Sequence, residues 1–158
     1  MLAPVVEAHV ADLRRIRRSP DISRRWGAED EAPGWPFDDP TATLFSVMVD
    51  GVVRGMIQYS EENTPGYRHA GIDIFIDPEI QGRGIGRDAV RTLARHLVRD
   101  RGHRRLTIDP AVDNAPAIRC YAAVGFCPVG VTRRYERDAD GHGCHDALLM
   151  DLLAEELA

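Results

Sequence analysis

The chain has 158 residues, of which 44% are hydrophobic and 28% are charged, a composition typical of a globular domain with one core. Its net charge is −5 with the histidines neutral, whereas nucleic-acid-binding domains usually present a basic face. No apolar run reaches the roughly eighteen residues of a membrane-spanning helix, so we expect binding neither to nucleic acid nor to a membrane.

The first residues give no sign of export. Met1-Leu2-Ala3-Pro4 is soon followed by the acidic Glu7 and Asp12, whereas a secretory signal has a basic start and an apolar stretch. We therefore expect a cytoplasmic protein. From the length of the chain we expect a single domain over residues 1–158.

The first forty residues predict two helices and a loop. Apolar residues at helical spacing indicate a helix from about His9 to Arg18, and Pro20 opens a second, short helix that runs to Arg25. The stretch 27–40 is rich in glycine, proline and acidic residues, which is typical of a loop. Before these helices, Val5-Val6 is at most the stub of an opening strand.

Three strands are predicted next. Their residue types favour strands over Leu44–Val49 and Val52–Tyr59, joined by an Asp-Gly hairpin turn. In the third strand, Ile72 to Ile76, isoleucines alternate with other residues. This alternation places Asp73 and Phe75 together on the opposite face of the strand.

Helices then alternate with strands. We expect a long helix over about Gly86–Val98, a short strand at Leu106–Ile108, a helix over Asn114–Val124, and a closing hairpin with strands Phe126–Tyr135 and Ala147–Leu153. A sheet with helices between its later strands is an α/β (α+β) layer fold.

A glycine-rich segment, Gln81-Gly82-Arg83-Gly84-Ile85-Gly86, lies between the third strand and the long helix. Its glycines allow a tight turn and a close approach of the backbone to a ligand. The N–H groups and the dipole of the following helix favour an anion such as phosphate, and Arg83 and Arg87 add positive charge. The order of glycines differs from the dinucleotide-binding and P-loop motifs, and a plain strand-to-helix turn is the alternative interpretation.

A second motif lies downstream of this segment. The pattern Asn-x-x-Ala-x-x-x-Tyr-x-x-x-Gly-Phe is filled by Asn114, Ala117, Tyr121, Gly125 and Phe126. Together with Gln81–Gly86, which fits Gln/Arg-x-x-Gly-x-Gly/Ala, it resembles the GNAT superfamily of N-acetyltransferases over about Thr43–Leu153. The resemblance implies a mixed, mostly antiparallel sheet of six to seven strands, splayed at its centre and flanked by helices. It also implies acetyl-coenzyme A (acetyl-CoA) as the cosubstrate.

Within this superfamily the chain is most similar to the aminoglycoside 6′-N-acetyltransferases. The likeness rests on the acidic segment 61–68, on Gly71-Ile72-Asp73, on Asp109-Pro110 before Asn114, and on Arg25-Trp26-Gly27. It implies direct transfer of an acetyl group to an amine of a small, positively charged substrate.

The resemblance also implies the residues that bind acetyl-CoA. The loop Gln81–Gly86 and Arg87 would hold the pyrophosphate, and the pantetheine arm would lie between the third strand and the strand after the long helix. A backbone N–H at Phe75 or Ile76 would polarise the acetyl carbonyl. Asn114 would contact the pantetheine or simply cap its helix.

Three residues are candidates for the chemistry. Asp73 matches the relatives' proposed general base, acting directly or through water, and is otherwise a solvent-facing carboxylate. Tyr121 would protonate the departing thiolate, or pack on its helix face, or do both. Asp109 would bind a substrate ammonium, or is the turn residue before Pro110. Cys120 is rejected as a nucleophile, because the family transfers the acetyl group directly and no histidine is near in sequence.

Further acidic and aromatic side chains are candidates to surround a cationic substrate. They are Trp26, Trp35, Glu61, Glu62, Glu136, Asp138 and Asp140. The alternatives are solvated loop residues and tryptophans that pack the N-terminal loop against the core. We expect no metal, because His142-x-Cys144-His145 lacks a partner pair of ligands. The odd count of three cysteines indicates reduced thiols.

The sequence therefore predicts an acetyl-CoA-dependent N-acetyltransferase that acts on an aminoglycoside-type amine, as a monomer or a homodimer. Alternatives within the family are acetylation of a protein N-terminus, a polyamine or another small amine. The alternative from another class is a non-catalytic acetyl-CoA sensor.

Overall fold

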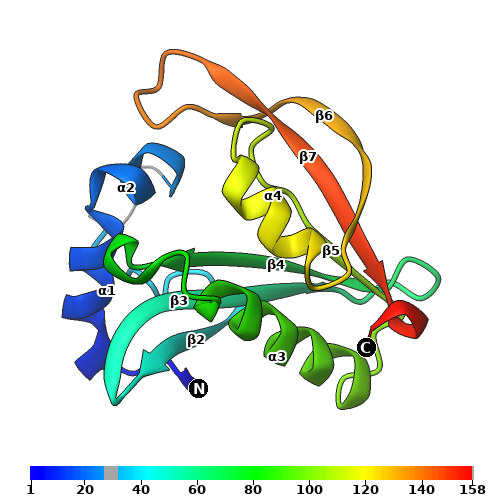
Figure 1. Cartoon of the computed structure of the whole chain (residues 1–158), viewed down its shortest axis with the longest axis horizontal. Helices are drawn as coiled ribbons and strands as arrows, with labels where there is room; N and C mark the ends of the chain where they lie inside the picture. The colour runs from blue at the N-terminus through cyan, green and yellow to red at the C-terminus, as the bar shows by residue number, and fades with distance from the viewer. Residues whose placement is uncertain (27–31, 158) are drawn as a thin grey trace.

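A seven-stranded sheet with helices on both faces forms the protein (Figure 1). The computed structural model describes residues 1–26 and 32–157. The strands are β1 (Leu2–Pro4), β2 (Ala42–Val49), β3 (Val52–Glu62), β4 (His69–Ile76), β5 (Arg105–Ile108), β6 (Cys127–Arg137) and β7 (Cys144–Leu153). The helices are α1 (Val10–Arg17), α2 (Pro20–Trp26), α3 (Ile85–Arg99) and α4 (Ala115–Ala122), with 3₁₀ turns at Glu7–His9, Pro78–Ile80 and Ala154–Glu156.

The strand order is β1-β2-β3-β4-β5-β7-β6. Neighbouring strands are antiparallel except β4 and β5, which are parallel and are joined through α3, as a parallel pair requires a crossover connection. This mixed, mostly antiparallel sheet with flanking helices confirms the fold class predicted from the sequence.

Most predicted elements are confirmed, with corrections at their ends. The opening strand is Leu2–Pro4 rather than Val5-Val6, and it pairs with β2. Both β3 and β6 continue beyond the predicted strands, because their polar residues still pair through the backbone with β4 and β7. Part of the predicted loop 27–40, residues 27–31, lies outside the described residues.

The two faces of the sheet pack different helices, and β4 contributes to both. Ile72 and Ile76 pack in the hydrophobic cluster that contains the buried face of α3. Phe75 lies in the other cluster with Leu13 and Ile16 of α1. The predicted alternation along this strand is therefore confirmed, and it turns Asp73 toward the side of α1 and α2.

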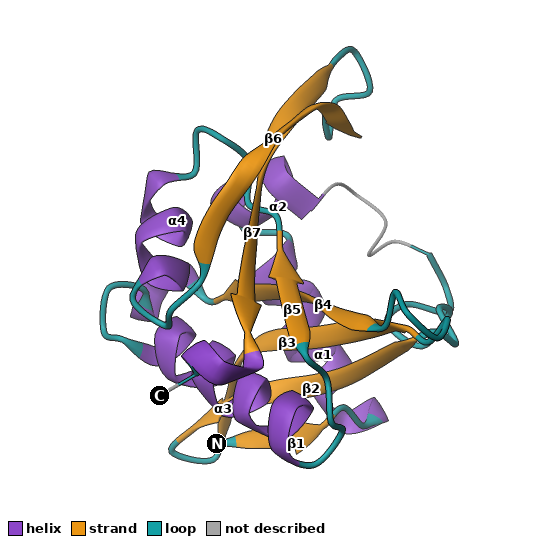
Figure 2. Cartoon of the chain, turned by 90° about the vertical axis from the view of Figure 1, so that its right-hand side faces the viewer, coloured by secondary structure: helices purple, strands orange, loops and turns teal. Residues whose placement is uncertain are grey.

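The sheet opens at its centre. β4 pairs with β5 only at Ala70↔Leu106 and Gly71↔Thr107, although β4 continues to Ile76. Figure 2 shows β5, β7 and β6 rising steeply away from β2, β3 and β4. The two strands therefore separate and border an opening, which confirms the predicted splay.

The longest helix is buried along one face only. The longest, α3, has 15 residues and buries one stripe, including Val90, Leu93 and Leu97, while its arginines lie outside the core. Among the helices of residues 1–26 and 32–157, none combines the length and the apolarity needed to cross a membrane.

Candidate active site

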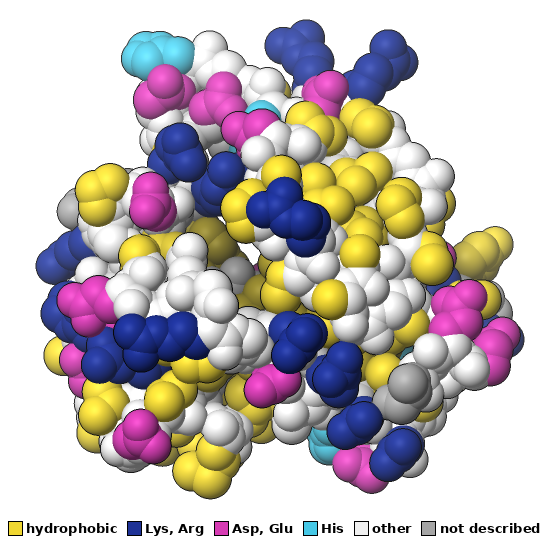
Figure 3. Space-filling view, viewed as in Figure 1, with side chains coloured by type: hydrophobic (Ala, Val, Ile, Leu, Met, Phe, Trp, Pro, Cys, Tyr) yellow, Lys and Arg dark blue, Asp and Glu magenta, His cyan; other side chains and the backbone are white. Residues whose placement is uncertain are grey.

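A cleft of about 350 Å³ lies where β4 and β5 separate. Ile72–Ile74 of β4 and Ile108–Pro110 at the end of β5 line it from the sheet, and Trp26 and Trp35 line it from the N-terminal part of the chain. In Figure 3 the surface is hollowed at this place, between α2 and α4. The backbone splay and the N-terminal helices together form a concave site.

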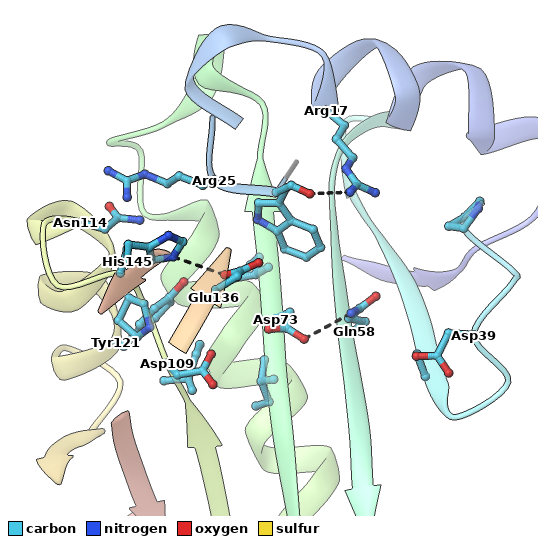
Figure 4. A pocket seen from close by; sticks show the side chains of 18 of the residues that line it. Arg17, Arg25, Asp39, Gln58, Asp73, Asp109, Asn114, Tyr121, Glu136 and His145 are labelled. Atoms are coloured by element: carbon cyan, nitrogen blue, oxygen red, sulfur yellow. Dashed lines mark hydrogen bonds and ion pairs between the residues drawn. The ribbon is translucent and has the colours of Figure 1, made fainter. Parts of the chain in front are cut away.

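Carboxyl groups dominate the charged residues of this cleft. The described residues that line it include Asp38, Asp39, Asp73, Asp109 and Glu136. Figure 4 shows three of them on separate segments, with Asp73 on β4, Asp109 beyond β5 and Asp39 on the opposite side. A cleft with several carboxylates favours a cationic ligand.

Asp73 lies on the floor of the cleft. Its side chain is reached by solvent, yet the cleft walls surround it, and this burial raises the pKa of Asp73 to about 6. The nearby charges of Asp109 and Glu136 raise the pKa further, whereas the hydrogen bond that Gln58 Nε2 donates to Asp73 Oδ2 at 3.2 Å lowers it. A carboxylate with this pKa is ionised at neutral pH and is a stronger base than an ordinary aspartate.

Tyr121 and Asn114 bring α4 to the same cleft. Burial raises the pKa of Tyr121 well above its usual range, and the nearby Cys120 and Asp73 raise it further, so its hydroxyl keeps its proton at neutral pH. Asn114 accepts a hydrogen bond from the N–H of Ala117 at 3.4 Å. It caps α4 and lines the cleft, so the two interpretations of Asn114 are compatible.

Asp109 also lines the cleft, and a tyrosine outside the cleft lining is hydrogen-bonded to it. Tyr135 Oη of β6 donates a hydrogen bond to Asp109 Oδ2 at 2.5 Å. This bond is the largest cause that raises the pKa of Tyr135 above its usual range. The turn residue before Pro110 is therefore held by a side chain from a distant strand.

The predicted anion loop connects β4 to α3 beside this opening. Gly82 and Gly84 have positive φ values of 77° and 82°, a conformation that favours glycine. Gly84 is the N-cap of α3, so the N–H groups of the first helical turn lack intrahelical acceptors. Gln81 Nε2 donates to the carbonyl of Ile76 at 2.9 Å, which ties the loop to the end of β4.

One edge of β4 faces the opening, and the other edge pairs with β3. The N–H of Asp77 donates to the carbonyl of Arg54 on β3 at 2.8 Å. Because N–H groups alternate between the two edges of a strand, the N–H of Phe75 points to β3 and that of Ile76 points to the opening. The side chain of Phe75 is buried against Trp26, with ring centroids 5.0 Å apart.

The structure does not bring Glu61 and Glu62 to the cleft. Glu61 is held by Arg101 Nη2 at 2.9 Å and by His103 Nε2 at 2.7 Å, and these bonds lower the pKa of Glu61. Glu62 accepts from the N–H of Thr64 at 2.7 Å. The sequence predicts that the two carboxylates bind substrate, but they lie at the end of β3, outside the cleft lining, and have structural partners.

Other residues of the cleft were missed in the sequence. Asp38 and Asp39 lie in a segment predicted only as a loop, and Gln58 reaches Asp73 because the two residues pair across β3 and β4. His145 lines the cleft and contacts Asp138 at 3.0 Å. These residues come together only through the register of β3 with β4 and through the position of the β6–β7 hairpin beside the cleft. No local sequence pattern could therefore indicate them.

One histidine of the β6–β7 hairpin is paired with carboxylates, and the cysteine next to it is a free thiol. His145 lies between Glu136 and Asp138, and Cys144 is an exposed thiol. Within residues 1–26 and 32–157, no group of three or more His, Cys, Asp or Glu side chains is arranged to hold a metal ion.

Several curated proteins share sequence with this chain, among them three acetyltransferases. The [ribosomal protein bS18]-alanine N-acetyltransferase of Salmonella typhimurium is 36% identical over 51% of this chain and 52% of its own length. The streptothricin acetyltransferase of Streptomyces lavendulae is 33% identical over 90% of this chain and 72% of its own length. The aminoglycoside N(6′)-acetyltransferase type 1 of Klebsiella pneumoniae is 39% identical over 43% of this chain and 33% of its own length. The chain thus spans about half of the length of the bS18-alanine N-acetyltransferase and a third of the length of the aminoglycoside N(6′)-acetyltransferase.

The fold is also that of solved acetyltransferase structures. The structure of AAC(6′)-Ib in complex with paromomycin and acetyl-CoA has a TM-score of 0.80, with 24% identity, 99% of this chain covered and 94% of that chain. The model of the acetyltransferase (GNAT) family matches residues 10–126, which is more than half of the chain. The streptothricin acetyltransferase is also matched along most of its length, and the splayed sheet and the glycine loop agree with this family. The chain therefore belongs to the acetyltransferase (GNAT) family.

Proposed function

We propose that this protein is an N-acetyltransferase that moves the acetyl group of acetyl-CoA to an amine of a polycationic small molecule of the aminoglycoside type. The observation that carries the proposal is the position of Asp73, a carboxylate with a pKa of about 6 on the floor of an acidic cleft. The cleft opens where the strands separate, beside the glycine loop.

The residues between β4 and α3 suit the pyrophosphate of acetyl-CoA. The left-handed glycines leave the loop backbone uncovered, since a Cβ on Gly82 would meet nothing within 4 Å. The first turn of α3 offers N–H groups and the positive end of its dipole. Arg83 and Arg87 are exposed at this turn and add positive charge for the phosphates.

The opening between β4 and β5 suits the acetylated pantetheine arm. In this proposal the N–H of Ile76, which points into the opening, polarises the acetyl carbonyl, and Phe75 has only a packing role. The oxyanion that forms when the amine attacks is stabilised by such a fixed donor. This choice follows from the peptide alternation set by the hydrogen bond between Asp77 and Arg54.

Asp73 and Tyr121 supply the proton transfers. Asp73 accepts the proton that the substrate amine loses, directly or through water, so that the nitrogen lone pair attacks the thioester carbon. When the tetrahedral species collapses and the C–S bond breaks, Tyr121 donates its proton to the departing sulfur. The buried, protonated state of Tyr121 at neutral pH suits this role.

The acidic lining supports a substrate with several positive charges. Figure 4 shows Asp109 and Glu136 on one side of Asp73 and Asp39 on the other, and Asp38 also lines the cleft. The segment shared with the aminoglycoside N(6′)-acetyltransferase supports the aminoglycoside class. Streptothricin is a second candidate, because the streptothricin acetyltransferase matches 90% of this chain.

Release of free coenzyme A thiol from acetyl-CoA tests the proposal. We expect thiol release with kanamycin, tobramycin or streptothricin, and much less with a peptide that begins with alanine, because the peptide offers fewer positive charges to the carboxylates. Mass spectrometry of the product should show one added acetyl group. Thiol release with the peptide alone would replace the small-molecule substrate by a protein N-terminus, and acetyl-CoA binding without turnover would indicate a sensor.

Replacement of Gly84 tests the anion loop. Gly84→Ala forces a side chain into the left-handed region, which costs about 1–2 kcal/mol. We expect acetyl-CoA binding to weaken about tenfold in calorimetry, because relief of this strain displaces the N–H groups of the loop. The matched control is Gly51→Ala, since Gly51 has a φ of 77° in the β2–β3 turn with open space around it. Equal acetyl-CoA affinity in the two variants would contradict the assignment of the loop.

A further inference from the structure

The strand β6 leaves its regular pairing beside the cleft. Between Thr132 and Glu136 the register with β7 shifts, so that residues 133–135 face the single residue Asp146. Arg134, in the middle, has a positive φ of 51°, and its N–H donates to Asp146 Oδ1 at 2.7 Å. Bulges of this kind re-aim side chains and are frequent near active sites, and a strained non-glycine residue persists only where its surroundings hold it.

The irregular stretch directs Tyr135 toward the end of β5. Since β7 lies between β5 and β6 in the sheet, the Tyr135 side chain spans β7 to donate its 2.5 Å hydrogen bond to Asp109. Tyr135 as a whole is half exposed, at 50%. Asp109 lines the cleft, and Tyr135 is outside the lining. Tyr135 therefore contacts a lining residue of the cleft, Asp109, from outside the lining.

The hydrogen bond fixes one oxygen of a carboxylate that lies close to Asp73. A short O–H···O⁻ bond is strong and holds the acceptor in one orientation. Among the described residues, Asp109 Oδ1 has no hydrogen-bond partner, so it is available to a ligand in the cleft. Asp109 and Asp73 line the same cleft, and the charge of Asp109 raises the pKa of Asp73. The cleft therefore offers both carboxylates to a ligand with two amines.

We propose that Tyr135 is a positioning residue that holds Asp109 as a second ammonium-binding group beside Asp73, and that this pair selects substrates with more than one positive charge. The inference rests on the proposed function and deepens it. One amine of the substrate meets Asp73 and is acetylated, and a second ammonium is bound by Asp109. A carboxylate that is free to rotate would bind that ammonium more weakly, because its orientation must be fixed on binding.

Tyr135→Phe removes only the hydroxyl and tests the inference with two acceptor amines. Tobramycin carries several amines and glucosamine carries one. We expect kcat/KM for tobramycin to fall about tenfold, which is the size expected for a lost hydrogen bond to a charged group, through KM and with kcat nearly unchanged. The kcat/KM for glucosamine, measured at low concentration, should stay the same. The matched control is Tyr67→Phe, since Tyr67 is 77% exposed in the β3–β4 loop, and it should change neither value.

A double-mutant cycle with Asp109→Asn completes the experiment. In the Asp109→Asn protein, Tyr135→Phe should add no further loss of tobramycin affinity, which calorimetry measures without turnover. A purely structural role would instead lower the melting temperature and weaken both amines equally, and that result would overturn the inference. Wild-type affinity in Tyr135→Phe, or no tobramycin binding by the wild type, would also overturn it. Tobramycin binding without any acetylation would refute the proposed function, and the same calorimetric cycle would still decide the role of Tyr135.

Discussion

Asp73→Asn should lower kcat by about 100- to 1,000-fold, the size typical of a lost general base, and leave acetyl-CoA affinity unchanged. Asparagine keeps the shape of the side chain and its contact with Gln58, but it cannot accept the amine proton. The measurement is thiol release with tobramycin, accompanied by calorimetry with acetyl-CoA. A variant that keeps wild-type kcat would show that the amine loses its proton to another acceptor.

The pH dependence gives a second readout for Asp73. The base is active when ionised, so wild-type kcat/KM should rise with pH through a midpoint near 6, the pKa of Asp73. The substrate amine loses its proton at higher pH and gives a second, separate rise in the pH profile of kcat/KM. The rise near pH 6 should vanish in Asp73→Asn, and a rise that persists would assign it to a different group.

The melting temperature of Asp73→Asn shows whether a loss of activity comes from misfolding. The pKa of Asp73 is about 6 in the fold and 3.8 in its ordinary state, so the folded protein holds the proton more tightly. Folding stability therefore decreases as pH rises from about 4 to 6. Asp73→Asn removes this loss, and its melting temperature above pH 6 should equal or exceed that of the wild type. A lower melting temperature would show that the carboxylate stabilises the fold.

Tyr121→Phe should lower kcat by about 100-fold near neutral pH. Phenylalanine preserves the buried ring, and among the described residues the Tyr121 hydroxyl donates to no protein acceptor, so little stability should be lost. The reason for the loss is that the departing thiol no longer receives a proton. Steady-state thiol release at saturating acetyl-CoA measures the effect.

The pH profile of Tyr121→Phe separates a proton donor from a packing residue. In Tyr121→Phe the departing sulfur must take its proton from solvent, which protonates a thiolate less readily above the thiol pKa of about 8.5. Wild-type Tyr121 keeps its proton over this range because its pKa is raised, so the defect of Tyr121→Phe should grow as pH rises above about 8.5. A defect that is the same at every pH, or no defect at all, would leave Tyr121 with only its packing role on α4.

The fold could be predicted to a large extent from the sequence. Periodicity along α3 and alternation along β4 are local properties, and they indicated the helix, the strand and the face that carries Asp73. The ends of β3 and β6 could not be predicted in this way. Their last residues are polar, and they remain in the sheet because β4 and β7 offer backbone partners.

The sequence by itself determined the family motifs, the glycine turn before α3 and the candidates Asp73, Asp109 and Tyr121, because each depends on neighbours along the chain. Only the tertiary structure decided which charges share the cleft. Glu61 is 42 positions from His103 and pairs with it, and Tyr135 is 26 positions from Asp109 and holds it. Such pairs depend on strand register, on a bulge and on the angle at which the sheet opens, and long-range backbone pairing sets all three.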